Sequence, residues 1–519
     1  MSTVFEYFFE GCRMRSLFTI IMSFLILFPV VSASAEEDFT VSFEGIPRGS
    51  VNARIACHDP SIIAANGKYY IFGSHMVAAY SENMRSWTPL ANGYHPTNRV
   101  WGNLFEEGLH VFDYAGLGTS LIPTDDGGCH VWAPDVVWNP VMGKYMMYYC
   151  TTSTWNVSNL CFGISDSVEG PYVWQAPLIY SGFDKTTVAA TDVGLYADEA
   201  WIGSHYLTLA GGYQYKECPN AIDPSVFFDA DGRFWMVYGS WSGGIFLLEL
   251  DPATGLVIHP EADPARDVDP YFGKRLLGGG HHAIEGPYIL WDAGAGWYYL
   301  FVSYGELTSH GGYQIRVFRS RTPDGDYEDM NGARPGKAGQ APYGLKLSGN
   351  YNLPSVRTAY MATGHNSAFI DSDGRRYICS HTRFDDGTES HIPMVKQYGL
   401  NEEGWPCMLP YATRKETIPD SFDPAGVPGR YYVINQGTAI NDVIAEPFIL
   451  YLREDGSVAG EDLSGAWRLA EGSVWLRLTL GSSEYSGIVC RMQDDGASDV
   501  VVFSAVGQNE SIWGVKYDE

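Results

Sequence analysis

The sequence predicts an all-β fold, a five-bladed β-propeller followed by a smaller β-domain of the barrel or sandwich type. The chain has 519 residues, is rich in Gly (58 residues) and aromatic residues (14%), and is only 18% charged. This composition is typical of many short strands joined by tight turns. In addition, one β-hairpin pattern recurs five times, and a separate series of alternating strands follows the last copy.

Each copy of the hairpin has a polar head, a short apolar strand, a Gly-containing turn and an aromatic-rich strand ending in Ser or Tyr. The heads are at Asp59, Asp135, Asp223, Glu285 and His365. Their spacing of about 60–90 residues suits four-stranded propeller blades with long loops. The innermost strands of a propeller line its axis, so we expect the heads to converge there. Three of them, Asp59, Asp223 and Glu285, carry an acid in the same place.

The remaining segments complete the predicted domain organisation. An apolar run at residues 16–31 follows Arg13 and Arg15 and precedes the small residues 33–35, which indicates a signal peptide and export to the periplasm or the medium. No other run is long and apolar enough to span a membrane. The predicted parts are a signal peptide (1–35), the propeller (36–412), a proline-containing linker (413–429) and the C-terminal β-domain (430–519).

Charge and cysteine usage exclude several functions. The net charge of −28 argues against nucleic acid and polyanionic substrates, because phosphate or carboxylate polymers need a basic surface. No Cys/His spacing indicates a zinc site, and Cys150, Cys161 and Cys379 lie in apolar strand patterns typical of buried free thiols. The Asp-Gly pairs at residues 231–232 and 373–374 indicate hairpin turns rather than calcium loops.

The acidic heads are the candidate catalytic residues. Hydrolysis of a glycosidic bond needs a proton donor at the leaving oxygen and a carboxylate that activates water or attacks directly. Asp59, Asp223 and Glu285 meet these needs if the propeller brings them together. A single Asp-Pro-Ser would indicate only a turn, but two such motifs at equivalent positions, with Glu-Gly-Pro at a third, favour catalysis.

A set of short motifs carries a resemblance to a known family. The motifs are His58-Asp59-Pro60-Ser61, Ala133-Pro134-Asp135, Asn220-Ala221-Ile222-Asp223-Pro224-Ser225, Gly239-Ser240-Trp241-Ser242, Ile284-Glu285-Gly286-Pro287-Tyr288 and Gly364-His365-Asn366. In this order and spacing the set resembles the glycoside hydrolase family 43 endo-α-1,5-L-arabinanases, and more narrowly the longer extracellular type with a C-terminal β-domain. The expected substrate is therefore arabinan or arabino-oligosaccharides, and we expect a monomer.

The resemblance implies an inverting mechanism and a role for each acid. Asp59 would be the general base, Glu285 the general acid with a raised pKa, and Asp223 the group that orients the acid and keeps its pKa high. It also implies a set of sugar contacts: Asp59, Asn220, Ala221, Ile222, Asp223, Ser240, Trp241 and Ser242. Trp241 is expected to stack on a sugar ring or to belong to a blade core.

The resemblance further implies a calcium ion bound to His365, which heads the fifth repeat. Hard cations prefer oxygen ligands, so water molecules would have to complete the coordination of such an ion. An ion at this position could tune the pKa values of the carboxyls electrostatically.

Other functions remain open from the residues alone. One is an exo-acting relative with the same three acids: an α-L-arabinofuranosidase, β-xylosidase or exo-arabinanase. The long loop at residues 105–129 could wall one end of the groove, which would favour exo cleavage. Two non-enzymatic alternatives are a secreted sugar-binding propeller and a structural exported β-protein.

Overall fold

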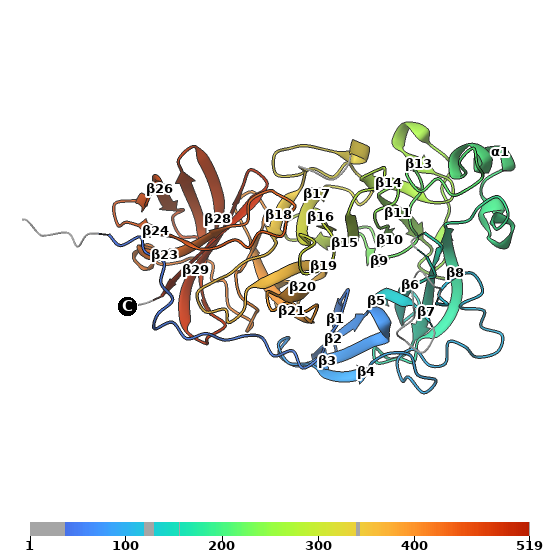
Figure 1. The fold of residues 1–519 in the computed structure, drawn as a ribbon, viewed down its shortest axis with the longest axis horizontal. Helices are drawn as coiled ribbons and strands as arrows, with labels where there is room; N and C mark the ends of the chain where they lie inside the picture. The colour runs from blue at the N-terminus through green and yellow to red at the C-terminus, as the bar shows by residue number, and fades with distance from the viewer. Residues whose placement is uncertain (1–36, 119–128, 155, 339–342, 518–519) are drawn as a thin grey trace, which may run out of the picture. The chain divides into compact units, whose positions relative to one another are not determined.

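The computed structural model describes residues 37–118, 129–154, 156–338, 343–517. The predicted signal peptide, residues 1–35, therefore lies outside the described residues. The structure is all-β, with a five-bladed propeller and an eight-stranded barrel (Figure 1). This confirms the predicted fold class and resolves the barrel-or-sandwich alternative in favour of a closed barrel.

Five antiparallel sheets form the blades, and in each the two strands of a predicted hairpin come first. Blades 1 and 2 consist of β1 (Ser61–Ala65), β2 (Lys68–Gly73), β3 (Val77–Ser81), β4 (Thr88–Ala91), β5 (Val131–Asn139), β6 (Lys144–Thr152), β7 (Ser158–Ser165) and β8 (Val173–Ser181). Blade 3 consists of β9 (Ser225–Phe228), β10 (Phe234–Tyr238), β11 (Ile245–Leu250) and β14 (Gly273–Leu277), extended by β12 (Val257–Ile258) and β13 (Val268–Asp269). Blades 4 and 5 consist of β15 (Ile284–Asp292), β16 (Trp297–Tyr304), β17 (Gln314–Ser320), β18 (Leu345–Ser348), β19 (Tyr360–Ile370), β20 (Arg376–Phe384), β21 (His391–Leu400) and β22 (Pro406–Met408).

The first strands of the blades form a closed ring around the axis. Each contacts the next in the order β1, β5, β9, β15, β19, and β19 contacts β1 again. Blade 5 therefore lies beside blade 1, although the two are far apart in the sequence (Figure 1). This closure is what places the heads of all five repeats near one another.

Local sequence explains the strands and their turns. The second strands of the blades are buried almost throughout, as in β6 and β16, which accounts for their continuous apolar and aromatic runs. Both Asp-Gly pairs lie in hairpin turns, as predicted. The Asp229 N–H donates to the Arg233 carbonyl at 2.9 Å, and the turn residue Gly232 has a φ of +80°, which glycine adopts at little cost.

The C-terminal barrel contains strands β23–β30 in sequence order, and β30 pairs with β23 to close it. The strands are β23 (Gly429–Asn435), β24 (Phe448–Leu452), β25 (Ser457–Gly460), β26 (Ser464–Leu469), β27 (Trp475–Leu480), β28 (Ser483–Gln493), β29 (Asp499–Gly507) and β30 (Glu510–Tyr517). The described helices are single turns: η1 (Ser74–Met76), η2 (Val188–Ala190), η3 (Val193–Leu195), α1 (Glu199–Trp201), η4 (Ile202–Tyr206), η5 (Pro264–Arg266), η6 (Gly336–Ala338) and η7 (Pro424–Gly426).

One hydrophobic core joins the barrel to blades 4 and 5. It contains Ile315 and Tyr351 from the propeller side and Cys490, Val502 and Trp513 from the barrel, all buried. Contacts between β18 and β30 and between β22 and β29 accompany it. The barrel therefore stabilises the propeller by packing against it.

The eight cysteines among the described residues are buried and free, which confirms the prediction for Cys150, Cys161 and Cys379. Within the part of the chain that the structure describes, no helix is long and apolar enough to cross a membrane.

Candidate active site

At the equivalent position of every repeat, a residue in the left-handed backbone region precedes or interrupts the innermost strand. These residues are Asp59, Ala133, Asp223, Gly286 and His365, with φ between 42° and 56°. A proline follows the first four, and Asn366 follows the last. A non-glycine residue costs about 1–3 kcal/mol in this conformation. Because the surrounding fold maintains it in all five blades, the bend is a built-in feature of the axis.

This register corrects one prediction from the sequence. The repeat position of Asp59 and Asp223 corresponds to Gly286, so Glu285 comes one residue earlier and Asp135 two residues later than predicted. Only two of the three acids occupy the same repeat position. Successive strand residues face opposite ways, so Glu285 reaches the site through a β-bulge between Glu285 and Tyr288.

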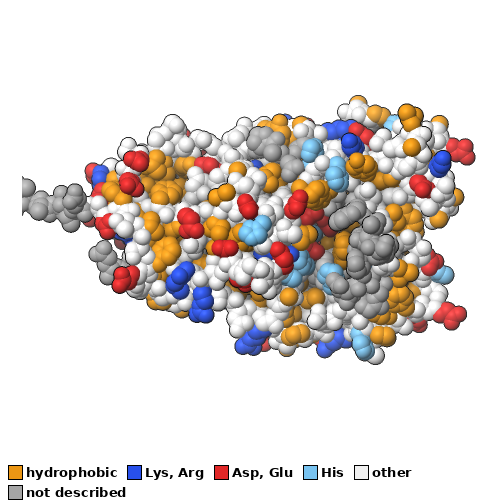
Figure 2. All heavy atoms as spheres, in the orientation of Figure 1, with side chains coloured by type: hydrophobic (Ala, Val, Ile, Leu, Met, Phe, Trp, Pro, Cys, Tyr) orange, Lys and Arg blue, Asp and Glu red, His pale blue; other side chains and the backbone are white. Residues whose placement is uncertain are grey.

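The heads nevertheless converge. Residues from all five blades line one small pocket on the axis, among them Asp59, Asp135, Asp223, Tyr288 and His365. On the molecular surface, histidine and acidic side chains gather over the propeller (Figure 2).

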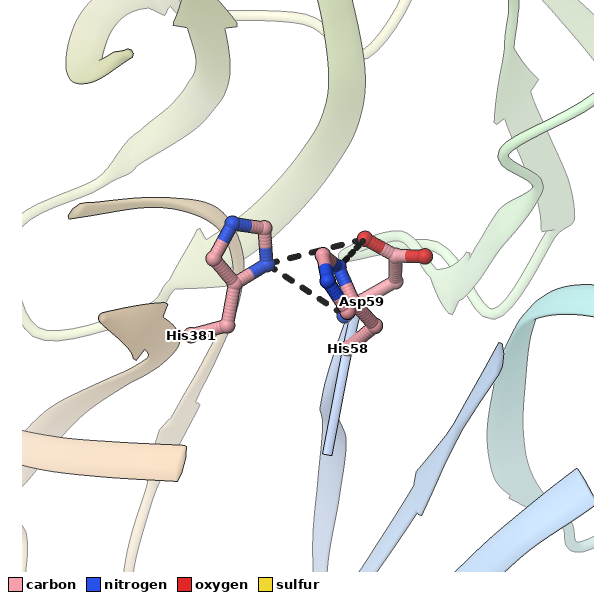
Figure 3. Close-up of side chains that lie close together, drawn as sticks. All are labelled: His58, Asp59 and His381. Carbon is pink, nitrogen blue, oxygen red and sulfur yellow. Dashed lines mark hydrogen bonds and ion pairs between the residues drawn. The ribbon is translucent and has the colours of Figure 1, made fainter. Parts of the chain in front are cut away.

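Asp59 is surrounded by hydrogen-bond donors and imidazole rings. Its Oδ1 lies 3.1 Å from His365 Nδ1. The same oxygen lies 3.7 Å from the Nδ1 atoms of both His58 and His381 (Figure 3). Its Oδ2 accepts a hydrogen bond from the Ser74 hydroxyl. Burial on its own would raise the pKa of the Asp59 carboxyl, but the charge on His365 and hydrogen bonds from His381 and His58 hold it well below its usual range.

Glu285 is buried and held by three donors. Its Oε1 accepts from the Tyr313 hydroxyl at 2.7 Å. Its Oε2 accepts from the Ser240 hydroxyl at 3.0 Å and from Trp241 Nε1 at 2.9 Å. The carboxyl therefore has a single fixed orientation.

Asp223 lies close to Glu285 in space, although the two are far apart in the sequence. Its Oδ2 accepts a hydrogen bond from the Gly286 N–H at 3.2 Å, so it holds the backbone immediately after Glu285. Burial raises the pKa of the Asp223 carboxyl. The charge on His365 opposes this rise, while the charges on Glu285 and Asp59 add to it.

His365 lies among the three carboxyls. Its backbone N–H donates to the Ser303 hydroxyl at 2.7 Å. Burial alone would lower the pKa of its ring, yet the charges of Asp59, Asp223 and Glu285 raise it. The same negative field would favour a bound cation. In its neutral form the His365 ring would supply one nitrogen donor to such an ion, which fits a calcium site completed by oxygen ligands such as water.

A second potential metal group is formed by His58, Asp59 and His381, whose ligand atoms lie within 4.8 Å of one another (Figure 3). Two imidazoles and one carboxylate suit zinc or another transition metal better than calcium. Burial lowers the pKa of His381 to about 3, so this ring is neutral.

The remaining predicted contacts divide into two sets. Ser240 and Trp241 touch Glu285, as described, and Trp241 is partly exposed, so it is not a blade-core residue. Ser242 instead donates to Asn156 Oδ1 at 2.9 Å.

Asn220, Ala221 and Ile222 are buried in the segment leading to Asp223. The Ala221 N–H donates to the Ser181 hydroxyl at 2.9 Å, and Gly239 N–H donates to the Ile222 carbonyl at 3.0 Å. In this structure the three residues hold the Asp223 segment in place. Residues 119–128, within the loop predicted to wall the groove, lie outside the described residues.

Sequence reasoning missed Tyr313, His381 and Ser74, which contact the candidate catalytic carboxyls directly. Ser74 ends the first repeat, and its hydroxyl also accepts from the Ala133 N–H at 2.8 Å. His381 lies on β20 and Tyr313 directly precedes β17. Neither has an acidic residue next to it in the sequence, so no local pattern marks them.

Glycoside hydrolysis needs two carboxyl groups on either side of the scissile bond, and the buried carboxyls near the propeller axis fit that requirement. The chain belongs to glycosyl hydrolases family 43, whose model matches residues 53–406. A C-terminal lipocalin-like domain model matches residues 409–514, in agreement with the barrel.

Known proteins of this kind are similar over 68% to 91% of the chain. The extracellular endo-alpha-(1->5)-L-arabinanase 2 of Bacillus subtilis is 35% identical over 89% of this chain and 93% of its own length. The crystal structure of the endo-1,5-alpha-L-arabinanase from Thermotoga petrophila superposes with a TM-score of 0.78 at 34% identity, covering 91% of this chain and all of that one. An extracellular exo-alpha-(1->5)-L-arabinofuranosidase of Cellvibrio japonicus is 26% identical over 68% of this chain and 86% of its own length. The protein is thus a family 43 glycosidase.

Proposed function

We propose that the protein hydrolyses α-1,5-L-arabinofuranosidic bonds within arabinan chains, with inversion at the anomeric carbon. The observation that carries this proposal is the arrangement of the three acids: Asp59 and Asp223 line the pocket on the propeller axis, and Glu285 directly precedes Gly286, whose N–H donates to Asp223 at 3.2 Å. The two relatives at about 35% identity, both named endo-arabinanases, support the choice of substrate. Arabinan is neutral, which suits a strongly acidic protein.

Asp59 acts as the general base. Its low pKa keeps the carboxylate ionised, so it can accept a proton from the water molecule whose oxygen attacks the anomeric carbon. The Ser74 hydroxyl, which donates to Oδ2, and the His365 ring, 3.1 Å from Oδ1, hold the orientation of this carboxylate.

Glu285 acts as the general acid. It gives its proton to the leaving glycosidic oxygen as the bond from that oxygen to the anomeric carbon breaks. Asp223 accepts a hydrogen bond from the backbone N–H after Glu285 and so holds that segment. Because the pKa of Asp223 is raised, the neighbouring pair Asp223 and Glu285 can keep one proton at neutral pH.

Trp241 is placed to contact the sugar, because its partly exposed indole lies directly beside the acid. Ser240, Asn220, Ala221, Ile222 and Ser242 complete the proposed substrate-binding set. His365 would hold a calcium ion, which would supply positive charge next to the carboxyls when bound. Residues 1–35 would direct export, to the periplasm or the medium, in keeping with the names of the extracellular relatives.

The test is a time course of products from linear α-1,5-arabinan with the purified mature chain, with and without prior chelation. Mixed oligosaccharides of many lengths, appearing from the first minutes, are expected for internal cleavage. One short product from the start would replace the proposal with exo action. If arabinan gives no product, arabinan is not the substrate, and xylan and aryl arabinofuranosides become the next to assay.

Glu285→Gln provides the matched control. The variant keeps the size of the side chain and an acceptor for Tyr313 but cannot give up a proton, so we expect kcat to fall by about 10²- to 10⁴-fold. Binding of arabino-oligosaccharides, measured calorimetrically, should persist. Unchanged turnover would contradict the role of Glu285, and binding without turnover in the wild type would indicate a sugar-binding propeller.

A further inference from the structure

Arg383 contacts the histidine that precedes the proposed base. It lies on β20, two residues after His381, and is 3% exposed. Its Nη2 is 3.0 Å from His58 Nε2. A guanidinium group only donates hydrogen bonds and stays protonated in proteins, so Nε2 of His58 must be the acceptor.

The acceptor role of Nε2 decides where the hydrogen of His58 lies. A neutral imidazole with a free lone pair on Nε2 carries its hydrogen on Nδ1. That nitrogen lies 3.7 Å from Asp59 Oδ1, so the N–H dipole faces the carboxylate. The other tautomer would place a lone pair opposite the negative charge.

The guanidinium cannot turn away from this contact, because its other nitrogens are also bound. Nε donates to the Leu307 carbonyl at 2.8 Å, and Nη1 donates to the Glu389 carbonyl. Nη1 also lies 3.2 Å from Glu389 Oε2, and that carboxylate accepts from the Ser309 hydroxyl at 2.7 Å.

The ring of His58 is held as well. It packs against the rings of both His381 and His391, with centroid distances of 4.6 Å and 4.0 Å. Two packed rings and one charged hydrogen bond therefore set both its plane and its orientation.

We propose that Arg383 is a positioning residue that fixes His58 in the Nδ1–H tautomer, so that its ring donates toward Asp59. The inference rests on the proposed role of Asp59 as the base. It also explains the cluster of His58, Asp59 and His381. In this tautomer Nδ1 of His58 has no free lone pair, so the three residues form a polar cluster around the base instead of a metal site.

The direct test is the ¹⁵N spectrum of protein labelled at histidine nitrogens, with the His58 signals assigned by their loss in His58→Gln. We expect a pyrrole-type Nδ1 and a pyridine-type Nε2 for His58 in the wild type. In Arg383→Met we expect the His58 hydrogen to move to Nε2 or to be shared between both nitrogens, so that the two signals swap or average. Arg383→Lys keeps a donor and should retain the wild-type pattern in part. A pyridine-type Nδ1 in the wild type would overturn the inference, whether or not any variant folds.

Kinetics on arabinan provide the second readout. In Arg383→Met we expect kcat to fall at least tenfold while KM changes less than twofold, with partial recovery in Arg383→Lys. The matched control is Arg376→Met, at the other end of the same strand, which breaks a partly buried ion pair with Asp292. It should lower stability and leave kcat near the wild-type value. An equal loss of kcat in both variants would mean that Arg383 is only structural.

The outcomes separate this inference from the function on which it rests. If Glu285→Gln retains turnover, the proposed function fails regardless of the tautomer. If Glu285→Gln is inactive and His58 carries its hydrogen on Nε2, the function stands and the inference about Arg383 fails.

Discussion

At the scale of single residues, Tyr313 connects the proposed acid Glu285 to His381, which lies beside the proposed base Asp59. Its hydroxyl donates to Glu285, and its ring lies parallel to that of His381, with centroids 5.4 Å apart and an interplanar angle of 6°. His381 in turn contacts Asp59. One fully buried aromatic side chain therefore orients both the proposed acid and a ring beside the proposed base.

Tyr313→Phe tests this link. The substitution keeps the packing on His381 and removes one hydrogen bond to the acid. That bond strengthens as Glu285 gives up its proton, because a hydrogen bond to a charged group is worth about 1.5–3 kcal/mol. We therefore expect kcat/KM on arabinan to fall at least about tenfold, with little change in the midpoint of thermal unfolding.

Tyr304→Phe is the matched control. The Tyr304 hydroxyl is equally buried but has no hydrogen-bond partner among the described residues, so its removal should leave kcat/KM unchanged. Equal activity of the Tyr313 variant and the wild type would show that the hydrogen bond to Glu285 has no catalytic part.

At the scale of elements, the innermost strands are joined by side chains as well as by packing. Asp135 on β5 accepts from the Ser61 hydroxyl of β1 at 2.5 Å and from the Val226 N–H of β9 at 2.7 Å. The acid of the second repeat thus connects three blades, and burial raises its pKa. In the sequence it looks like another member of the acidic set, but its contacts are those of a structural residue.

Asp135→Ala tests this role. It leaves the hydroxyl of Ser61 and the N–H of Val226 buried without their acceptor, at a cost of about 1–3 kcal/mol each. We expect the free energy of unfolding, measured in urea, to fall by about 2–5 kcal/mol. Asp135→Asn keeps the shape and one acceptor oxygen, so its loss should be smaller. A loss below about 0.5 kcal/mol for the alanine variant would contradict the interpretation.

The sequence predicted these elements well because each hairpin is local. Alternating apolar residues, a Gly-containing turn and an aromatic strand are properties of neighbouring residues. The one-residue offset of Glu285 could not be predicted, because a β-bulge depends on how the strand pairs with its neighbour.

At the scale of the whole molecule, the shared core buries two lysines between propeller and barrel. Lys396 donates to the Tyr351 hydroxyl at 2.6 Å and to the Pro410 carbonyl at 2.7 Å, and its ammonium lies 4.4 Å from the Trp513 ring centroid. Burial lowers the pKa of Lys396 and of Lys346 to about 7. The interface therefore holds proton-binding groups that the unfolded chain would keep charged.

The pH dependence of stability follows from these lysines. Above pH 7 the unfolded chain still binds a proton on each lysine, because the unfolded pKa is near 10.5, whereas the folded chain releases it. The free energy of unfolding should therefore rise between pH 7 and 8.5, by up to about 1.4 kcal/mol per pH unit for each lysine. Below pH 7 both states are charged, and this contribution to the slope disappears.

Urea unfolding at several pH values, with Lys396→Met, provides the measurement. The variant loses two hydrogen bonds, so its stability will differ at every pH, but the informative quantity is the slope, which should decrease. Lys185→Met, at an exposed site, should keep the wild-type slope. A flat profile in the wild type would mean that Lys396 and Lys346 remain charged in the folded state.

By itself, the sequence determined the all-β fold class, the number of blades, the five heads and the candidate acids Asp59, Asp223 and Glu285, because each depends on short-range patterns and their repetition. Tertiary structure alone decided which side chains contact and orient those acids. Tyr313, His381 and Arg383 reach the axis from blades 4 and 5, and their roles arise when the ring of blades closes. Hydrogen-bond partners across such a ring are set by distances in space, which no spacing along the chain records.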